Sequence, residues 1–115
     1  MTSVKRGNVG ENTAIKILVE NGYKILKRNY RCKSGEIDII CNKKRILYFV
    51  EVKARWNLEK GYPEEAVTKK KLEHIRKSIF WYVKEKKVKT ELFRILVVSI
   101  LFTDNRVIYK LIPVD

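Results

Sequence analysis

The fold is decided by residues 35–54, which read GEIDIICNKKRILYFVEVKA. Polar and apolar residues alternate over 36–41, as in a strand with two different faces. The polar run 42–45 predicts a turn. Residues 46–54 begin apolar on both faces, which is typical of a central strand that is covered on both sides. The stretch therefore predicts a β-hairpin whose second strand lies inside a sheet.

On either side of this hairpin, the sequence predicts two helices and three further strands. A first helix should span about Val9–Asn21 and end at Gly22. A second should start at Pro63 or at Thr68 and run to about Lys87. The remaining strands are expected at Tyr23–Cys32, Leu92–Phe102 and Val107–Ile112. We therefore predict one α/β domain over residues 1–115, in the order α-β-β-β-α-β-β, with a mixed sheet flanked by helices.

Both helices show an apolar stripe at helical spacing. In the first helix the stripe contains Ala14, Ile15 and Leu18, and Glu11 lies at its end, aimed at whatever the helix covers. The alternative for Glu11 is an ordinary first-turn acid favoured by the helix dipole. In the second helix we predict a buried stripe and an opposite polar side. The stripe contains Leu72, Ile75, Ile79 and Val83, and the polar side contains Lys70, His74, Lys77, Trp81 and Lys84.

Positive charge is the strongest feature of the composition. The chain has 26 Lys and Arg against 13 Asp and Glu, a net charge of +13. The excess lies in two segments, residues 1–35 with +6 and residues 69–89 with +7, whereas 36–68 and 90–115 are neutral. Such a field attracts polyanions, so we expect a nucleic acid as partner. The alternative is a basic surface that serves solubility alone.

Several classes of protein are excluded by the sequence. No apolar run is long enough to span a membrane, and the polar N-terminus does not resemble a signal peptide, so we expect a cytoplasmic protein without a membrane partner. Cys32 and Cys41 are too few for a disulfide scaffold, and with His74 they do not form a zinc site. One histidine without a placed partner also argues against nucleophilic catalysis of the Ser/His/Asp type.

Acidic residues and a lysine meet at the predicted hairpin. Glu51 and Lys53 are two apart on one strand and share a face, with about 7 Å between their Cα atoms. A two-residue loop at Lys43-Lys44 would make Asp38 the diagonal neighbour of Glu51 and would pair Glu36 with Glu51. A four-residue loop would place Asp38 directly opposite Glu51. A three-residue loop would separate the acids onto opposite faces, so the site requires an even register.

Carboxylates that converge beside a lysine suit Mg²⁺, or Mn²⁺, which prefer oxygen ligands. We expect Asp38, Glu51 and Glu36 as metal ligands, with Glu11 reaching in from the first helix. Lys53 would orient the attacking water or stabilise the charge that develops on a phosphate. The alternative for Glu51 and Lys53 is an ordinary ion pair on a strand. At this point the pattern predicts a magnesium-dependent phosphodiesterase.

Further basic residues are candidates for phosphate contacts. Lys69, Lys70 and Lys71 stand at a helix start, where they oppose the dipole unless they meet an anion. Arg31 and Arg55 lie near the expected acidic cluster, and Arg55 is equally suited to a solvated strand end. Trp81, among lysines, either stacks on a base or makes a structural contact.

The chain resembles the YraN-type predicted endonuclease family of bacteria, which is distantly similar to Holliday junction resolvases and to restriction endonuclease-like folds. The resemblance covers residues 10–98. It is carried by Gly10-Glu11, Asn29-Tyr30-Arg31, Gly35-Glu36-Ile37-Asp38, Phe49-Val50-Glu51-Val52-Lys53 with Arg55, and Gly61, Pro63, Glu65-Ala66-Val67 and Lys71.

This resemblance implies a nuclease centre of Asp38, Glu51 and Lys53, with Glu11 as a helix-borne acid and DNA, including branched DNA, as substrate. Cutting both strands would suit a symmetric homodimer. Two alternatives stay open. One is a non-catalytic nucleic-acid-binding module on a nuclease-like fold, and the other is a basic RNA-associated protein. Binding in every case should weaken with salt, whereas turnover that requires a metal is expected of the nuclease alone.

Overall fold

A computed structural model describes residues 2–89 and 92–114 of the protein. Its elements, in chain order, are α1 (Ser3–Glu20), β1 (Lys24–Cys32), β2 (Gly35–Lys43), β3 (Ile46–Arg55), η1 (Pro63–Ala66), α2 (Lys69–Lys86), β4 (Phe93–Phe102) and β5 (Val107–Val114). The predicted order α-β-β-β-α-β-β is confirmed. Strand ends differ from the predicted ones by a residue or two.

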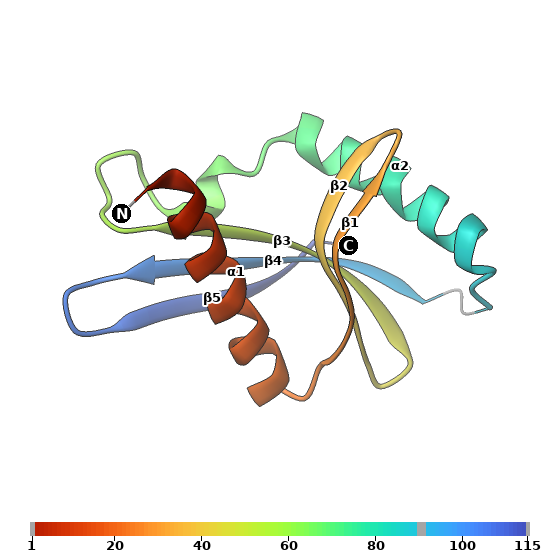
Figure 1. Cartoon of the computed structure of the whole chain (residues 1–115), viewed down its shortest axis with the longest axis horizontal. Helices are drawn as coiled ribbons and strands as arrows, with labels where there is room; N and C mark the ends of the chain where they lie inside the picture. Colours follow the sequence, from red (N-terminus) through yellow and green to blue (C-terminus); the bar gives the residue numbers. More distant parts are fainter. Residues whose placement is uncertain (1, 90–91, 115) are drawn as a thin grey trace.

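The five strands form one mixed sheet in the order β1-β2-β3-β4-β5 (Figure 1). β3 and β4 run parallel, and the other neighbouring pairs are antiparallel. Parallel neighbours cannot be joined by a tight turn, and here α2 lies in the connection between them. β3 therefore lies inside the sheet, as its apolar pattern predicted.

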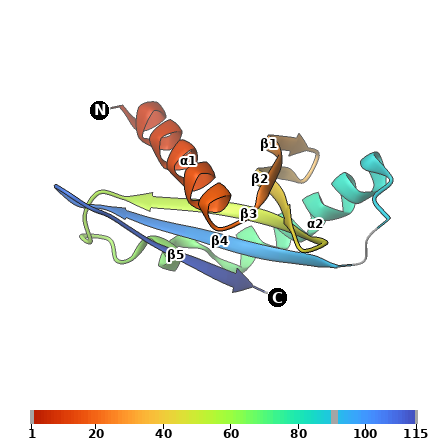
Figure 2. The same ribbon diagram turned by 90° about the horizontal axis from the view of Figure 1, so that it is seen from below.

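Two separate cores pack against the two faces of the sheet. α1 contributes Ala14, Ile17 and Leu18 to the first core, in which they meet residues of β2, β3 and β4. α2 contributes Ile75 and Tyr82 to the second, which contains Phe49 of β3. Figure 2 shows the two helices on opposite sides of the sheet. Odd and even positions of β3 are thus buried under different helices, which confirms that both of its faces are covered.

α1 starts six residues earlier than predicted, at Ser3 rather than Val9. Thr2 caps this start, because its side chain accepts a hydrogen bond of 3.2 Å from the Lys5 backbone N–H. The first turns are exposed, so no apolar periodicity marks them. The predicted end is correct, since Asn21 is the C-cap and Gly22 has a φ of 88°.

Both predicted starts of the second helical region are used. Pro63 begins the short η1, and Thr68 caps α2 by accepting from the Lys71 backbone N–H at 3.1 Å. The predicted buried stripe of α2 is only partly correct. The fully buried positions are Ile75, Ser78 and Tyr82, because the Tyr82 ring packs edge-on against Tyr30 and Phe49. This rotation also half-buries Trp81, which was predicted on the polar side.

The turn between β2 and β3 lies at Lys44-Arg45, one position later than the predicted loop at Lys43-Lys44. Both turn residues have positive φ, 50° and 67°, as a two-residue type I′ turn requires. Lys43 consequently pairs with Ile46, and Ile39 pairs with Val50. The register is even, as the site requires. It corresponds to the register predicted for a four-residue loop, in which Asp38 rather than Glu36 is level with Glu51.

β2 separates from β3 just where the acids lie. The paired positions end at Ile39, and the Asp38 side chain instead accepts a hydrogen bond of 2.8 Å from the Val52 backbone N–H. Beyond this point β2 pairs with β1 alone, and a two-stranded ribbon twists more strongly than a wide sheet. The predicted alternation is therefore wrong around Asp38: Ile37 packs in the α2 core together with Ile40, whereas Ile39 packs in the α1 core.

Cys41 is buried, Cys32 is half-buried, and both are free thiols. Among the described residues, neither helix has the length and apolar character needed to cross a bilayer.

Candidate functional site

Glu51 is a buried carboxylate on the α2 side of β3. It is 3% exposed, although a charged side chain is rarely buried unless it is paired. Lys53 Nζ lies 3.6 Å from its Oε1, and Lys71 Nζ lies 3.6 Å from its Oε2. Both contacts are longer than a hydrogen bond. Oε2 is a buried oxygen without a hydrogen-bond partner in the part of the chain that the structure describes.

Asp38 lies close enough to Glu51 for the two charges to repel. Burial, and then the charge of Glu51, raise the pKa of Asp38 from 3.8 to about 7. The hydrogen bond from the Val52 N–H and the charge of Lys71 act in the opposite direction and lower this pKa. Two carboxylates in this arrangement are stabilised either by a shared proton or by a cation.

A second carboxylate, Glu64 of η1, shows how a purely structural acid is satisfied in the same protein. It accepts a hydrogen bond of 2.6 Å from Ser99 Oγ and one of 2.7 Å from Lys110 Nζ. These bonds lower the pKa of Glu64 to about 2. The two lysines beside Glu51 lie farther away, at 3.6 Å, so Glu51 forms ion pairs without a comparable hydrogen bond.

The donor set fits Mg²⁺ or Mn²⁺. Oε2 of Glu51, which accepts no hydrogen bond within the described residues, and the Asp38 carboxylate are hard oxygen donors, and Mg²⁺ commonly takes only one or two protein carboxylates together with water and substrate phosphate. No group of three or more potential His, Cys, Asp or Glu ligands occurs among residues 2–89 and 92–114. The predicted larger cluster with Glu36 and Glu11 is therefore not assembled as a preformed cage.

Glu11 and Glu36 are held by basic neighbours. Glu11 Oε1 accepts hydrogen bonds from Arg28 at 3.3 Å and from Asn29 Nδ2 at 3.0 Å. Glu36 pairs with Arg31 at 3.3 Å on an exposed part of the hairpin. Glu11 points from α1 toward the sheet, as predicted, and its hydrogen bonds with Arg28 and Asn29 join the helix to β1.

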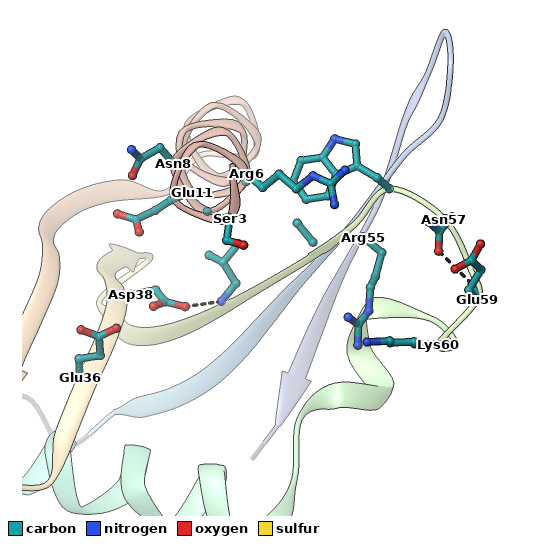
Figure 3. A pocket seen from close by; sticks show the side chains of 15 residues that line it. Ser3, Arg6, Asn8, Glu11, Glu36, Asp38, Arg55, Asn57, Glu59 and Lys60 are labelled. Atoms are coloured by element: carbon teal, nitrogen blue, oxygen red, sulfur yellow. Dashed lines mark hydrogen bonds between the residues drawn. The ribbon is translucent and has the colours of Figure 1, made fainter. Parts of the chain in front are cut away.

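A cavity of about 590 Å³ opens beside Asp38, between α1 and the end of β3. Its walls carry opposite charges at different places (Figure 3). Glu11, Glu36 and Asp38 lie together near β2, whereas Arg55, the last residue of β3, lies near Lys60 in the segment that follows. Arg6 reaches over the Trp56 ring at 5.1 Å from its centroid. The cavity thus offers acids for a cation and bases for phosphate oxygens.

The predicted phosphate-contacting residues are spread over several surfaces. Arg55 lines the cavity, and Arg31 is 80% exposed on the hairpin. Lys69 and Lys70 are exposed at the start of α2. Lys71, by contrast, points inward to Glu51. A lysine at a helix start is unfavourable because of the helix dipole, and here the carboxylate of Glu51 offsets this cost.

Sequence reasoning missed the contact between Lys71 and Glu51 as well as the basic wall of Arg6 and Lys60. Lys71 is 20 residues from Glu51 and on another element, and no local spacing relates them. Arg6 precedes the predicted helix start, so it had no assigned face. An exposed N-cap at Thr2 was the one signal that could have extended α1 to include it.

The fold and this site define an α/β protein with a mixed sheet and a buried carboxylate beside two lysines. Residues 10–100 match the model of the Uncharacterised protein family UPF0102, and the chain belongs to this family, which confirms the YraN-type resemblance. A UPF0102 protein of Caldicellulosiruptor saccharolyticus is 42% identical over 87% of this chain and 85% of its own length. Similar proteins of Lachnoclostridium phytofermentans and Dictyoglomus turgidum are 47% and 40% identical over 72% and 90% of this chain, and over 70% and 87% of their own lengths.

Proposed function

We propose that the protein is a metal-dependent endonuclease that hydrolyses phosphodiester bonds in DNA. The observation that carries this proposal is the buried Oε2 of Glu51, which accepts no hydrogen bond within the described residues, close to Asp38, whose pKa is raised. Such a pair is costly to the fold by itself, and a divalent cation held by Asp38 and Glu51 would remove the cost. The strongly basic chain supplies the attraction for a polyanion.

Each residue has a separate task in this proposal. A bound Mg²⁺ or Mn²⁺ would stabilise negative charge on the phosphate and make water more acidic. Lys53, whose side chain is 33% exposed and whose Nζ lies 3.6 Å from Glu51, can donate to a phosphate oxygen or orient the water. Lys71, whose Nζ lies 3.6 Å from Glu51 Oε2, supplies positive charge beside this carboxylate from the α2 side.

The cavity supports a path for the substrate strand. Asp38 lines its acidic part, although Glu51, on the α2 side of β3, does not, and Arg55 and Lys60 lie farther along its wall. A strand that places one phosphate at Asp38 would therefore meet positive charge at a following phosphate. Arg6, Arg55 and Lys60 are expected to position the strand without reading its bases.

The test is cleavage of end-labelled duplex, single-stranded and four-way-junction DNA, each with Mg²⁺, with Mn²⁺ or with a chelator. Asp38→Asn and Glu51→Gln should lose cleavage by at least about a hundredfold, because each removes a ligand charge at the reacting phosphate. Asp104→Asn, in an exposed turn, is the matched control for the loss of an acid and should cut like the wild type.

Two outcomes would count against the proposal. Cleavage that persists in both site variants would indicate another centre or a contaminant. Salt-sensitive binding without cleavage of any substrate, in either metal, would instead support the non-catalytic binding module, and a preference for RNA in the same assay would favour the RNA-associated alternative.

A further inference from the structure

An exposed aromatic patch lies on the outer side of α2, away from both cores. We call it the aromatic platform, and it consists of Lys33, Phe80, Trp81 and Lys84. Phe80 is 59% exposed, and its ring meets Trp81 edge-on with 5.7 Å between centroids. Lys84 Nζ lies 5.9 Å from the Phe80 centroid and 5.7 Å from that of Trp81, and Lys33 Nζ lies 5.6 Å from Trp81.

Trp81 is held in place, whereas Phe80 is left open. Trp81 Nε1 donates a hydrogen bond of 3.2 Å to Ser34 Oγ in the turn between β1 and β2. This contact accounts for the half-burial of Trp81 and fixes its ring against the hairpin. Phe80 belongs to neither core cluster of the described residues. The large apolar ring of Phe80 is therefore exposed to water, which is energetically unfavourable, and it lies beside the ring of Trp81, which is held by its hydrogen bond.

We propose that the aromatic platform binds unpaired bases of a DNA strand that extends from the nuclease site. This inference deepens the proposed function, because it names DNA with a single-stranded region next to the cleaved bond as the substrate class. Aromatic rings flanked by lysines are the usual means of binding single strands, since every base offers a face for stacking and every nucleotide a phosphate. Paired bases in a duplex have no such free face.

The charge around the platform selects a polyanion as its occupant. Residues 69–89, which include most of the platform, carry nine Lys and Arg against two acids. A second copy of this chain would bring an equally basic surface, with a net charge of +13, against it. Like charges of this size oppose such a contact. A nucleic acid strand matches the aromatic rings and the lysines together.

The β1–β2 hairpin joins the platform to the candidate site. Ser34, which contacts Trp81, is four residues from Asp38 along β2, a distance of about 13 Å in extended chain. Glu36 between them lines the cavity. A strand that leaves the cavity along the hairpin thus needs only a few nucleotides to reach Phe80.

The experiment uses Trp81 as its own reporter. The chain has two tryptophans, so Trp56→Phe leaves Trp81 as the single one. We expect Trp81 fluorescence to be quenched by an oligothymidine in metal-free buffer, and to change far less with a blunt duplex of equal length. In the otherwise wild-type protein, Phe80→Ala should weaken oligothymidine binding about tenfold. Phe80→Tyr should retain the binding, and Val4→Ala, which removes part of another exposed apolar residue on α1, should leave it unchanged.

Cleavage assays on the same variants separate this inference from the proposed function. If oligothymidine leaves Trp81 fluorescence unchanged, or if Phe80→Ala binds it as tightly as the wild type, the platform is overturned even when the wild type cuts DNA. If platform binding is found while no metal supports cleavage, the platform is supported and the nuclease is overturned. If both hold, Phe80→Ala should reduce the preference of the enzyme for duplexes with a single-stranded extension over blunt ones.

Discussion

Replacing Asp38 by Asn should stabilise the metal-free protein, and increasingly so as the pH rises. Burial and the charge of Glu51 raise the pKa of Asp38 from 3.8 to about 7 in the folded protein. An unfolded chain leaves an aspartate near its ordinary pKa of about 3.9. The folded state thus keeps a proton that the unfolded state has lost. The contribution of Asp38 to stability is consequently fully present below about pH 4 and is lost as the pH rises through 7.

The magnitude follows from the difference between the two pKa values. A pKa difference of about three, at about 1.4 kcal/mol for each unit, gives a loss of up to about 4 kcal/mol once the pH exceeds 7. The amide of Asp38→Asn still offers an oxygen to the Val52 N–H, so the backbone contact at the end of β2 is retained. The variant should therefore match the wild type near pH 4 and exceed it by several kcal/mol near pH 8.

Urea unfolding followed by tryptophan fluorescence, at about pH 4.5, 6, 7 and 8 with a chelator present, measures this directly. Asp104→Asn is the control, since it removes an exposed carboxylate far from Glu51 in sequence. Free energies of unfolding that stay parallel for wild type and Asp38→Asn across this range would refute the reasoning. So would a variant that is less stable at every pH.

Three further predictions follow from the same contacts. Mg²⁺ at ten times its dissociation constant should stabilise the wild type by about 1.4 kcal/mol near pH 8, as measured by thermal unfolding, and should leave Glu51→Gln unchanged; equal shifts in both would place the ion elsewhere. Glu64→Gln should destabilise the protein at neutral pH by about 1–3 kcal/mol, because the buried Ser99 and the exposed Lys110 lose a charged partner. Because the pKa of Glu64 is lowered to about 2, its contribution is present above about pH 4.5 and is lost as the pH falls toward 2, so the wild type and this variant should converge in acid. Gly10→Val should cost about 1–3 kcal/mol in urea unfolding, since a Cβ there would lie 3.1 Å from the Ala54 Cβ and α1 would have to move away from β3; Ala54→Gly in the same chain should restore part of the loss, and no restoration would show that the two do not collide.

The elements could be predicted from the sequence because their signals are local. Alternation at residues 36–41, the two apolar faces of residues 46–54 and the caps at Thr68 and Gly22 each depend on neighbours within a few positions. The start of α1 was missed because its first turns are exposed and leave no apolar pattern. The buried face of α2 was predicted wrongly because Tyr82, which is only moderately hydrophobic by residue type, packs inward against the rings of Tyr30 and Phe49.

The candidate site was predictable in its residue types and register, but not in its energetics. The sequence alone determined that Asp38, Glu51 and Lys53 lie on adjacent strands, because an even register in a tight hairpin leaves few other arrangements. The packing of distant elements brings Lys71 of α2 to Glu51, leaves Glu51 Oε2 without a hydrogen bond among the described residues, and pairs Glu11 and Glu36 with arginines. These features depend on how helices pack on the sheet and on where β2 twists away from β3. Such long-range packing balances many weak contacts over the whole fold, and no short stretch of sequence encodes it.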